Sequence, residues 1–362
     1  MPAPPDHIAR LRLIRSDNIG PITYFQLLAR FGSAQTAIDA IPDLAARGGG
    51  RAPRLASKSE IEREIDRVAK LGARHLFLGQ GAYPPLLAEL ETAPPALIVK
   101  GDIALLDRPA VAIVGARNAS AAACRFARQL ALALGEAGSV VVSGLARGID
   151  SAAHDGALDS GTIAVIAGGI DVVYPLENEA RQRAIAERGL LIAEQPPGVE
   201  PRARHFPYRN RIIAGLTHGT VVVEAAPKSG SLITARLAAE AGREVMAVPG
   251  SPLDPRAQGC NHLIREGATL VQTAEDVLEA ISPSRIRPFR QRELDYTAPG
   301  PAVDADEAAR RAVTDLLGPT PVPVDELVRQ SGRSPATVQT ILLELELAGR
   351  LERHAGGKVS AA

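Results

Sequence analysis

The sequence predicts an α/β protein in which a Rossmann-like, doubly wound sheet lies between a helical N-terminal domain and a C-terminal winged-helix domain. Three observations predict this architecture. Residues 1–75 carry apolar side chains at helical intervals. Residues 76–281 alternate short apolar runs with amphipathic helical segments, as in a parallel sheet covered on both faces. Residues 306–362 indicate helices followed by a hairpin, after a linker over residues 282–305.

The N-terminal domain is predicted from apolar positions such as Leu11, Leu27 and Phe31, which recur at helical intervals. The turn at residues 18–21 places Pro21 at the first position of the next helix. Turns of this kind contact DNA in helix-hairpin-helix elements. Packing or partner binding is nevertheless the role that we favour for this turn.

Nine apolar runs are the predicted strands of the central domain. They are RHLFL (74–78), ALIVKG (96–101), AVAIVG (110–115), SVVVSG (139–144), TIAVIA (162–167), GLLIAE (189–194), GTVVVE (219–224), EVMAVPG (244–250) and TLVQ (269–272). Helical periodicity between them, for example over 124–138 and 232–242, predicts the helices that cover the sheet.

The C-terminal domain is predicted from the boundaries of its last helix and from a Gly-Gly hairpin turn. Ser334 is the expected N-cap of that helix, Pro335 lies in its first turn and Gly349 follows its end. This helix carries Glu344 and Glu346 but no Lys or Arg, whereas helices that read duplex DNA offer basic or amide groups. We therefore favour a protein contact or an effect on dimerisation, and duplex DNA binding stays as the alternative.

Composition narrows the function classes. The chain has 362 residues, with Lys+Arg and Asp+Glu both at 41, so its formal net charge is zero. This balance argues against a uniformly basic coat for nucleic acid, although arginines gather in the predicted linker, at positions 285, 287, 290 and 292. Aromatic residues make up 3% and tryptophan is absent, which weakens any model of a broad stacking platform for bases.

Cysteine usage and the apolar runs predict a soluble cytoplasmic protein. Cys124 and Cys260 cannot form a disulfide framework or a cysteine-rich zinc site, so a reducing compartment is expected. The N-terminus lacks the apolar core of a signal peptide, and the apolar runs are shorter than the roughly 20 residues that span a bilayer. We expect no metal, no cofactor and no membrane contact.

Two loops between a strand and a helix predict a phosphate-binding edge of the sheet. Arg117 follows one buried strand, in the segment VAIVGARNAS, and an internal ion pair is its alternative role. The segment EAAPKSGSLITA places Lys228, Ser229, Gly230 and Ser231 between a strand and a helix, where an ordinary helix start is the alternative. Neither loop carries a dinucleotide fingerprint or a Walker A motif, so NAD, FAD and ATP hydrolysis are disfavoured.

Two further motifs offer polar side chains to the same edge. Arg209, Asn210 and Arg211 lie in HFPYRNRIIAGL at the expected start of a helix, where arginine suits phosphate oxygens and a solvated surface run is the alternative. Asn261 opens a helix in GCNHLIREGA, and it either contacts a ligand or caps that helix.

The segment SGLARGIDSAAHDGAL contains the strongest candidates for catalysis or metal binding. We expect Asp150 or Ser151 to cap the helix that carries His154. No Ser/His/Asp or Cys/His arrangement surrounds His154, so we favour a structural histidine. Asp150, His154 and Asp155 make no convincing metal set, and we assign no catalytic residue.

These motifs, in this order, resemble the bacterial DNA-processing protein A family, also called Smf. The carriers are VGAR (114–117), SGLARGIDSAAH (143–154), FPYRNRIIAGL (206–216), EAAPKSGSLITA (224–235), GREVMAVPG (242–250) and GCNHLIREGA (259–268). The flanking domains look like the sterile-alpha-motif-like (SAM-like) and winged-helix domains of some members. The resemblance implies an extended Rossmann fold.

The resemblance also implies a function that is not enzymatic. Family members bind single-stranded DNA in a positive pocket and protect incoming DNA during natural transformation. They help to load the RecA recombinase onto strands covered by single-strand-binding protein, and they form homodimers. Carried onto this chain, the DNA contacts would be Arg117, Lys228–Ser231 and Arg209–Arg211, with Asn261 as a weaker carry-over.

A nucleotide-processing enzyme is the alternative function. Lysine-decarboxylase-like proteins cleave nucleoside monophosphates at the glycosidic bond with Arg and Glu beside a Pro-Gly-Gly-x-Gly-Thr loop. Here Gly219 and Thr220 precede a strand instead of following one, and the paired glycines are missing. Glu224 remains as a possible catalytic carboxylate.

Overall fold

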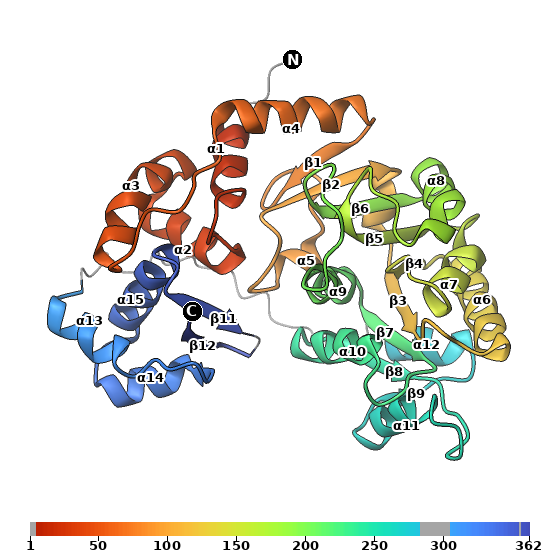
Figure 1. Cartoon of the computed structure of the whole chain (residues 1–362). Helices are drawn as coiled ribbons and strands as arrows, with labels where there is room; N and C mark the ends of the chain where they lie inside the picture. Colours follow the sequence, from red (N-terminus) through yellow and green to blue (C-terminus); the bar gives the residue numbers. More distant parts are fainter. Residues whose placement is uncertain (1–4, 283–304, 355) are drawn as a thin grey trace. The chain divides into compact units, whose positions relative to one another are not determined.

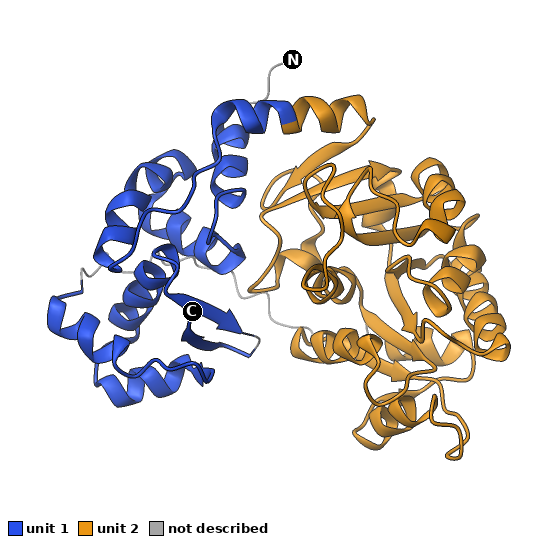
Figure 2. Ribbon diagram, in the orientation of Figure 1, with its two compact units in different colours: residues 1–63, 291–362 blue, residues 64–290 orange. Residues whose placement is uncertain are grey.

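The computed structural model describes residues 5–282, 305–354 and 356–362, and it divides the chain into two compact units. Unit 1 combines residues 1–63 with residues 291–362, and unit 2 is formed by residues 64–290 (Figure 2). The predicted linker and its arginines lie outside the described residues, apart from the positions at its ends. No helix in the described ranges is both long and apolar enough to cross a membrane.

Unit 2 is built on a nine-stranded sheet in the order β1-β2-β6-β5-β4-β3-β7-β8-β9 (Figure 1). The strands are β1 (Arg74–Phe77), β2 (Ala96–Gly101), β3 (Ala110–Gly115), β4 (Val140–Ser143), β5 (Thr162–Gly169), β6 (Leu190–Gln195), β7 (Gly219–Val223), β8 (Glu244–Ala247) and β9 (Thr269–Leu270). All nine predicted strands are present, and the prediction of a doubly wound α/β fold is confirmed.

The sheet is parallel from β6 to β9, but it carries an antiparallel edge that the sequence analysis did not predict. β2 pairs antiparallel with both β6 and β1. The connection from β1 to β2 contains only the four-residue α5 (Pro85–Ala88). Residues 78–95 are numerous enough for a crossover, but they form no full helix that could carry the chain across a face of the sheet, as the usual parallel βαβ connection does. The fully parallel sheet was therefore wrong for β1 and β2.

Alternating side chains of the strands bury both faces of this sheet. On β3, Ala112 and Val114 join the core beneath α5, α9 (His205–Gly215), α10 (Gly230–Glu240) and α11 (Gln258–Arg265). Val111 and Ile113 join the opposite core. That face is covered by α6 (Ala121–Glu136), α7 (Ile149–Ala157), α8 (Glu179–Arg188) and α12 (Ala274–Ala280). The period-2 alternation thus places one helical layer on each side.

Unit 1 contains a helical half and a winged-helix half. The first comprises α1 (Pro5–Ile14), α2 (Pro21–Phe31) and α3 (Ala34–Arg47), and the boundary between the units falls within α4 (Lys58–Lys70). The second comprises α13 (Glu307–Thr314), α14 (Val324–Ser331), α15 (Pro335–Leu347) and the strands β10 (Val322–Pro323), β11 (Leu351–His354) and β12 (Lys358–Ala361). The strands form a three-stranded sheet in the order β10-β12-β11, so the predicted winged helix is confirmed.

Helix α15 begins and ends at the residues that the sequence predicts. The Ser334 hydroxyl accepts a hydrogen bond from the Thr337 amide, and Gly349 adopts a positive φ of 70° just after the last turn. β11 and β12 pair antiparallel across Gly356 and Gly357, both of which have positive φ. These signals depend on local backbone geometry, so the sequence alone sufficed to place the helix.

The helix α15 is buried on two sides within unit 1. Val338 and Ile341 belong to the winged-helix core, whereas Leu343 and Leu347 belong to a cluster formed with apolar residues of α1, α2 and α3. The Gln26 amide donates to Gln339 at 3.0 Å across this contact. A helix that is apolar around most of its circumference needs partners on more than one side, and α3 supplies the second partner.

Glu344 of α15 is inside unit 1 instead of on a surface. Its side chain is 1% exposed and accepts two hydrogen bonds from the Arg310 guanidinium, at 2.8 and 3.2 Å. Glu346 is paired with Arg353 at 2.7 Å. Both acidic residues that argued against duplex recognition are therefore held in ion pairs within the protein.

Candidate nucleic-acid interface

The strand order creates a crevice at the carboxyl edge of the sheet, between β3 and β7. From β3 the chain builds β4, β5 and β6 toward one side, and after β7 it builds β8 and β9 toward the other. The helix after β3 covers one face and the helix after β7 covers the opposite face. The loops after these adjacent strands therefore diverge, and open α/β sheets bind ligands at such switch points.

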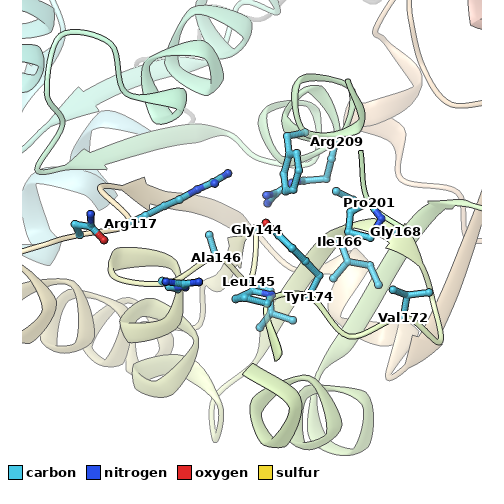
Figure 3. A pocket seen from close by; sticks show the side chains of 15 residues that line it. Arg117, Gly144, Leu145, Ala146, Ile166, Gly168, Val172, Tyr174, Pro201 and Arg209 are labelled. Atoms are coloured by element: carbon cyan, nitrogen blue, oxygen red, sulfur yellow. The ribbon is translucent and has the colours of Figure 1, made fainter. Parts of the chain in front are cut away.

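Arg117 and Lys228 lie in the two loops that border this crevice. Both side chains are exposed, and neither forms an ion pair with a described residue. The Arg117 guanidinium lies over the ring of Phe206, 5.2 Å from its centroid, and points toward the pocket beside it (Figure 3). The internal ion pair considered for Arg117 is thus absent among the described residues, and its charge is available to an anion.

The start of α10 contributes small residues to the same edge. The Ser229 hydroxyl accepts from the Ser231 amide and lies 2.7 Å from the Ser231 hydroxyl. A Cβ added at Gly230 would meet no atom within 4 Å, so the space beside it is open. The first-turn amides and the N-terminal end of the helix dipole therefore face a space that a phosphate group fits.

Arg209 is buried, which the sequence analysis did not predict. Helix α9 begins at His205, so Arg209 lies in its second turn instead of at its start, and only 6% of it is exposed. Its guanidinium lies across Gly144, where an added Cβ would be 1.3 Å from Nη1. Its Nε has no hydrogen-bond acceptor among the described residues. Burial lowers the pKa of Arg209 to about 10.

Asp150 interacts electrostatically with Arg209 and is itself buried. Its carboxylate accepts from the amides of Gly144 and Ala146 at 3.1 and 3.3 Å. Burial raises its pKa, and the nearby Arg209 charge and these two amides oppose that rise. The expected cap was wrong, because Gly148 is the N-cap of α7 and both Asp150 and Ser151 lie inside the helix. Asp150 instead fixes the loop after β4.

Two of the other predicted contact residues bind the protein's own groups. Arg211 is buried, pairs with Glu194 at 2.6 Å and donates to the Thr92 carbonyl. Asn210 donates to the Gly230 carbonyl at 3.4 Å, which links α9 to the start of α10. These bonds give both residues structural roles, and their contact with DNA stays a prediction.

Asn261 holds a loop together on α11. Its side chain accepts from the Gly250 amide at 3.1 Å and donates to the Gly250 carbonyl at 2.9 Å. This pair of bonds fixes the end of the segment that follows β8. The capping role considered for Asn261 was wrong, because Ala257 is the N-cap of α11 and Asn261 lies inside the helix; a ligand contact stays a prediction.

A pocket of about 240 Å³ opens between the loop of Arg117 and Arg209 (Figure 3). Its other walls come from the loops after β4 and β5, and they include Gly144, Ala146, Gly168, Val172 and Tyr174. Two aromatic side chains that the sequence analysis missed, Tyr174 and Phe206, pack there with ring centroids 5.6 Å apart. The Tyr-Pro pair in the segment VVYPLEN was the sequence signal for Tyr174 in this wall.

The side chains of His154 and Glu224 both contact other residues of the protein. His154 is fully buried, its Nδ1 lies 2.7 Å from the Thr162 hydroxyl, and burial lowers its pKa to about 3. The two carboxylate oxygens of Glu224 accept from the amide and the hydroxyl of Ser120, at 2.9 and 2.6 Å. His154 is therefore neutral and structural, as favoured from the sequence, and Glu224 anchors the start of α6.

Glu224 also has an unusual backbone conformation. Among the described residues other than glycine, Asn18, Leu145 and Glu224 have positive φ, and the last two follow strands at this edge. Such conformations cost free energy and gather at ligand-binding loops.

Comparison with known families matches nearly the whole described chain. The family model for DNA recombination-mediator protein A matches residues 74–282. The model for a DprA-like N-terminal HHH domain matches residues 4–66, and that for a DprA winged helix domain matches residues 297–357. The HHH model describes the part that resembles a SAM-like domain in the sequence.

Curated relatives and solved structures agree with these matches. DNA processing protein DprA of Streptococcus pneumoniae is 50% identical over 198 residues, covering 54% of this chain and 70% of the relative. Protein Smf of Escherichia coli is 38% identical over 291 residues, covering 76% and 74%.

Among solved structures, the X-ray structure of DNA processing protein A from Streptococcus pneumoniae has a TM-score of 0.63 and 38% identity, covering 77% of this chain and 98% of that one. A structure of DNA processing protein A from Helicobacter pylori has a TM-score of 0.52 and 30% identity, covering 57% and 94%, and its description concerns single-stranded DNA binding.

Proposed function

Because the chain belongs to the DNA recombination-mediator protein A family, we propose that it binds single-stranded DNA at the carboxyl edge of the nine-stranded sheet. One observation carries this proposal. The exposed cations Arg117 and Lys228 border the crevice between β3 and β7, each just before the N-terminus of a helix. Arginine, lysine and helix amides suit phosphodiester oxygens, so the strand is held mainly by its backbone.

The proposal includes the finer role that the family resemblance implies. The protein protects incoming DNA in natural transformation and helps to load RecA onto strands covered by single-strand-binding protein. It acts in the cytoplasm as a homodimer and performs no catalysis. The relatives that match along the chain support this role. The glycosidase alternative depended on Glu224, and the carboxylate of that residue instead accepts hydrogen bonds from Ser120.

The test is the salt dependence of affinity for a fluorescent dT oligonucleotide. If the edge neutralises about three to five phosphates, log affinity falls with log salt with a slope of about −2 to −3.5, since each phosphate contributes about −0.7 on a single strand. Arg117→Ala and Lys228→Ala should each weaken binding about tenfold or more and flatten the slope by about 0.7.

Arg188→Ala is the matched control for this test. Arg188 is the last residue of α8, at the opposite edge of the sheet, where its exposed side chain pairs with Asp159. Its removal changes the net charge equally but should leave both affinity and slope unchanged. Wild-type affinity in both Arg117→Ala and Lys228→Ala, with circular dichroism showing an intact fold, would reject the proposed edge.

A further inference from the structure

We propose that Arg256 is a third phosphate contact at the carboxyl edge of the sheet, and that Asp254 occupies its guanidinium until a bound strand displaces it. This inference rests on the proposed function and deepens it, because it assigns to the edge a cation that the protein itself neutralises in the absence of DNA. Arg117 and Lys228 are open to a phosphate at once, whereas Arg256 exchanges one anion for another.

The first step is the position of Arg256 beside the crevice between β3 and β7. Residues 248–257 connect β8 to α11, and Arg256 lies near the end of this loop. Its Nε is 3.7 Å from Oε1 of Glu224, the residue that follows β7. The same carboxylate accepts hydrogen bonds from Ser120, the N-cap of the helix after β3. Glu224 therefore joins the two sides of the crevice, and Arg256 lies next to it.

The second step is the charge that Arg256 brings to this place. The Glu224 carboxylate lies between the two loops that are proposed to hold phosphates, where an uncompensated negative charge would repel a DNA strand. The Arg256 guanidinium offsets that charge at 3.7 Å. Its side chain is also 47% exposed, so it still presents donors to the solvent side of the edge.

The third step is the pairing of Arg256 with Asp254. Nε and Nη2 of Arg256 donate to the two carboxylate oxygens at 3.1 and 2.9 Å, and the Arg256 amide donates to Oδ1 at 2.9 Å. These hydrogen bonds hold the pKa of Asp254 below its ordinary value, so the carboxylate is ionised at neutral pH. A phosphodiester offers two anionic oxygens to the same guanidinium fork. Asp254 therefore takes the place that a phosphate would take.

The fourth step is the low cost of the exchange. The side chains of Arg256 and Asp254 are 47% and 34% exposed, so water reaches both charges when they separate. An exposed ion pair of this kind favours the paired state by only about two- to fivefold. The hydrogen bonds of Asn261 to Gly250 fix the start of the loop, so a rotation of the Arg256 side chain is sufficient. Release of counterions from the strand then favours the phosphate over Asp254.

The test measures the affinity of the full chain for the fluorescent dT oligonucleotide in Asp254→Asn, in Arg256→Gln and in the double variant. Asp254→Asn should bind about two- to fivefold more tightly than the wild type, which is the factor by which the internal pair competes. Arg256→Gln should bind about five- to tenfold more weakly and flatten the salt slope by about 0.7, since one phosphate contact is lost. The double variant should match Arg256→Gln, because Asp254 acts through that guanidinium alone.

Asp159→Asn is the matched control, because Asp159 is 88% exposed and pairs with Arg188 at the opposite edge of the sheet. It removes the same charge and should leave both affinity and slope unchanged. An equal gain in Asp159→Asn or in the double variant means that Asp254 acts through net charge, and it overturns the inference. Unchanged or weaker binding by Asp254→Asn overturns it too, as does wild-type affinity in Arg256→Gln.

The outcomes also separate this inference from the proposed function. If Arg117→Ala and Lys228→Ala weaken binding while the variants of the loop after β8 bind as the wild type does, the proposed function stands and the exchange is rejected. If Arg117→Ala and Lys228→Ala bind as the wild type does while Arg256→Gln is weakened, the strand binds through the loop after β8 and the proposed edge is rejected. If the wild type does not bind the oligonucleotide, both are rejected.

Discussion

Gly48→Ala tests whether α15 packs against the N-terminal helices in solution. Gly48 follows α3 with φ −72° and ψ −1°, a conformation that alanine adopts without strain. In a free loop this substitution would stabilise the protein by about 0.4–1 kcal/mol through the unfolded state. In this structure, however, the new Cβ would lie 2.1 Å from the backbone oxygen of Glu344 in α15.

The expected magnitude follows from that contact. Real Cβ atoms essentially never approach closer than 3.0 Å, so α15 and the end of α3 must move apart. Overpacking of this kind costs about 1–3 kcal/mol. After the gain from the unfolded state is subtracted, we expect a net destabilisation of about 1–2 kcal/mol.

The assay is urea unfolding of the full chain, followed by hydrogen exchange in peptides from α3 and α15. Gly20→Ala is the control, since Gly20 also has a negative φ and a Cβ there meets nothing within 4 Å. It should change stability by less than about 0.5 kcal/mol. A stabilised Gly48→Ala protein would refute the packing of α15 on α3, because the sign of the effect depends on that contact alone.

Two further predictions concern unit 2. Gly144→Ala would place a Cβ 1.3 Å from Nη1 of Arg209, so the guanidinium must move away. We expect the free energy of unfolding in urea to fall by about 1–3 kcal/mol. The affinity for the dT oligonucleotide, measured by fluorescence anisotropy, should also fall, and wild-type affinity would contradict this prediction. Burial lowers the pKa of His154 from 6.5 to about 3, so the stability contributed by its neutral ring is present above pH 6.5 and is lost as the pH falls toward 3. Wild type should therefore lose about 3 kcal/mol more than His154→Asn between pH 7 and pH 4, and parallel pH profiles of unfolding would argue against a buried neutral ring.

Features set by local backbone geometry could be predicted from the sequence. Arg117 and Lys228 each stand in a loop between a strand and a helix, and neither depends on a distant partner for its place. The boundaries of α15 were equally accessible, because Ser334 and Gly349 act on their own backbone neighbours. In each of these segments the determining residues lie within a few positions of one another.

Features set by contacts between distant segments could not be predicted in the same way. Tyr174 and Phe206 meet only because β5 ends and α9 begins at the same edge, and their spacing in the sequence says nothing about it. Arg209 was expected at a helix start, yet α9 begins a turn earlier and buries it against Gly144. Gly144 makes room for the Arg209 guanidinium, but in the sequence alone this glycine indicates only a tight turn after a strand.

The apolar pattern of α15 predicts that the helix is buried on more than one side, but it does not identify the partner. Its run ILLELEL carries apolar residues on more than one side, which indicates a second packing partner but does not say which one. The structure gives α3 as that partner within unit 1.

Because unit 1 joins the two ends of the chain, its folding is tied to the order of synthesis. The helices α1, α2 and α3 leave the ribosome first, but Leu343 and Leu347, which complete their apolar cluster, leave it after the whole of unit 2. During that interval the face of α3 that α15 later covers is open to chaperones and to neighbouring chains. For the same reason, removal of α15 would expose the apolar residues of α3 that Leu343 and Leu347 cover.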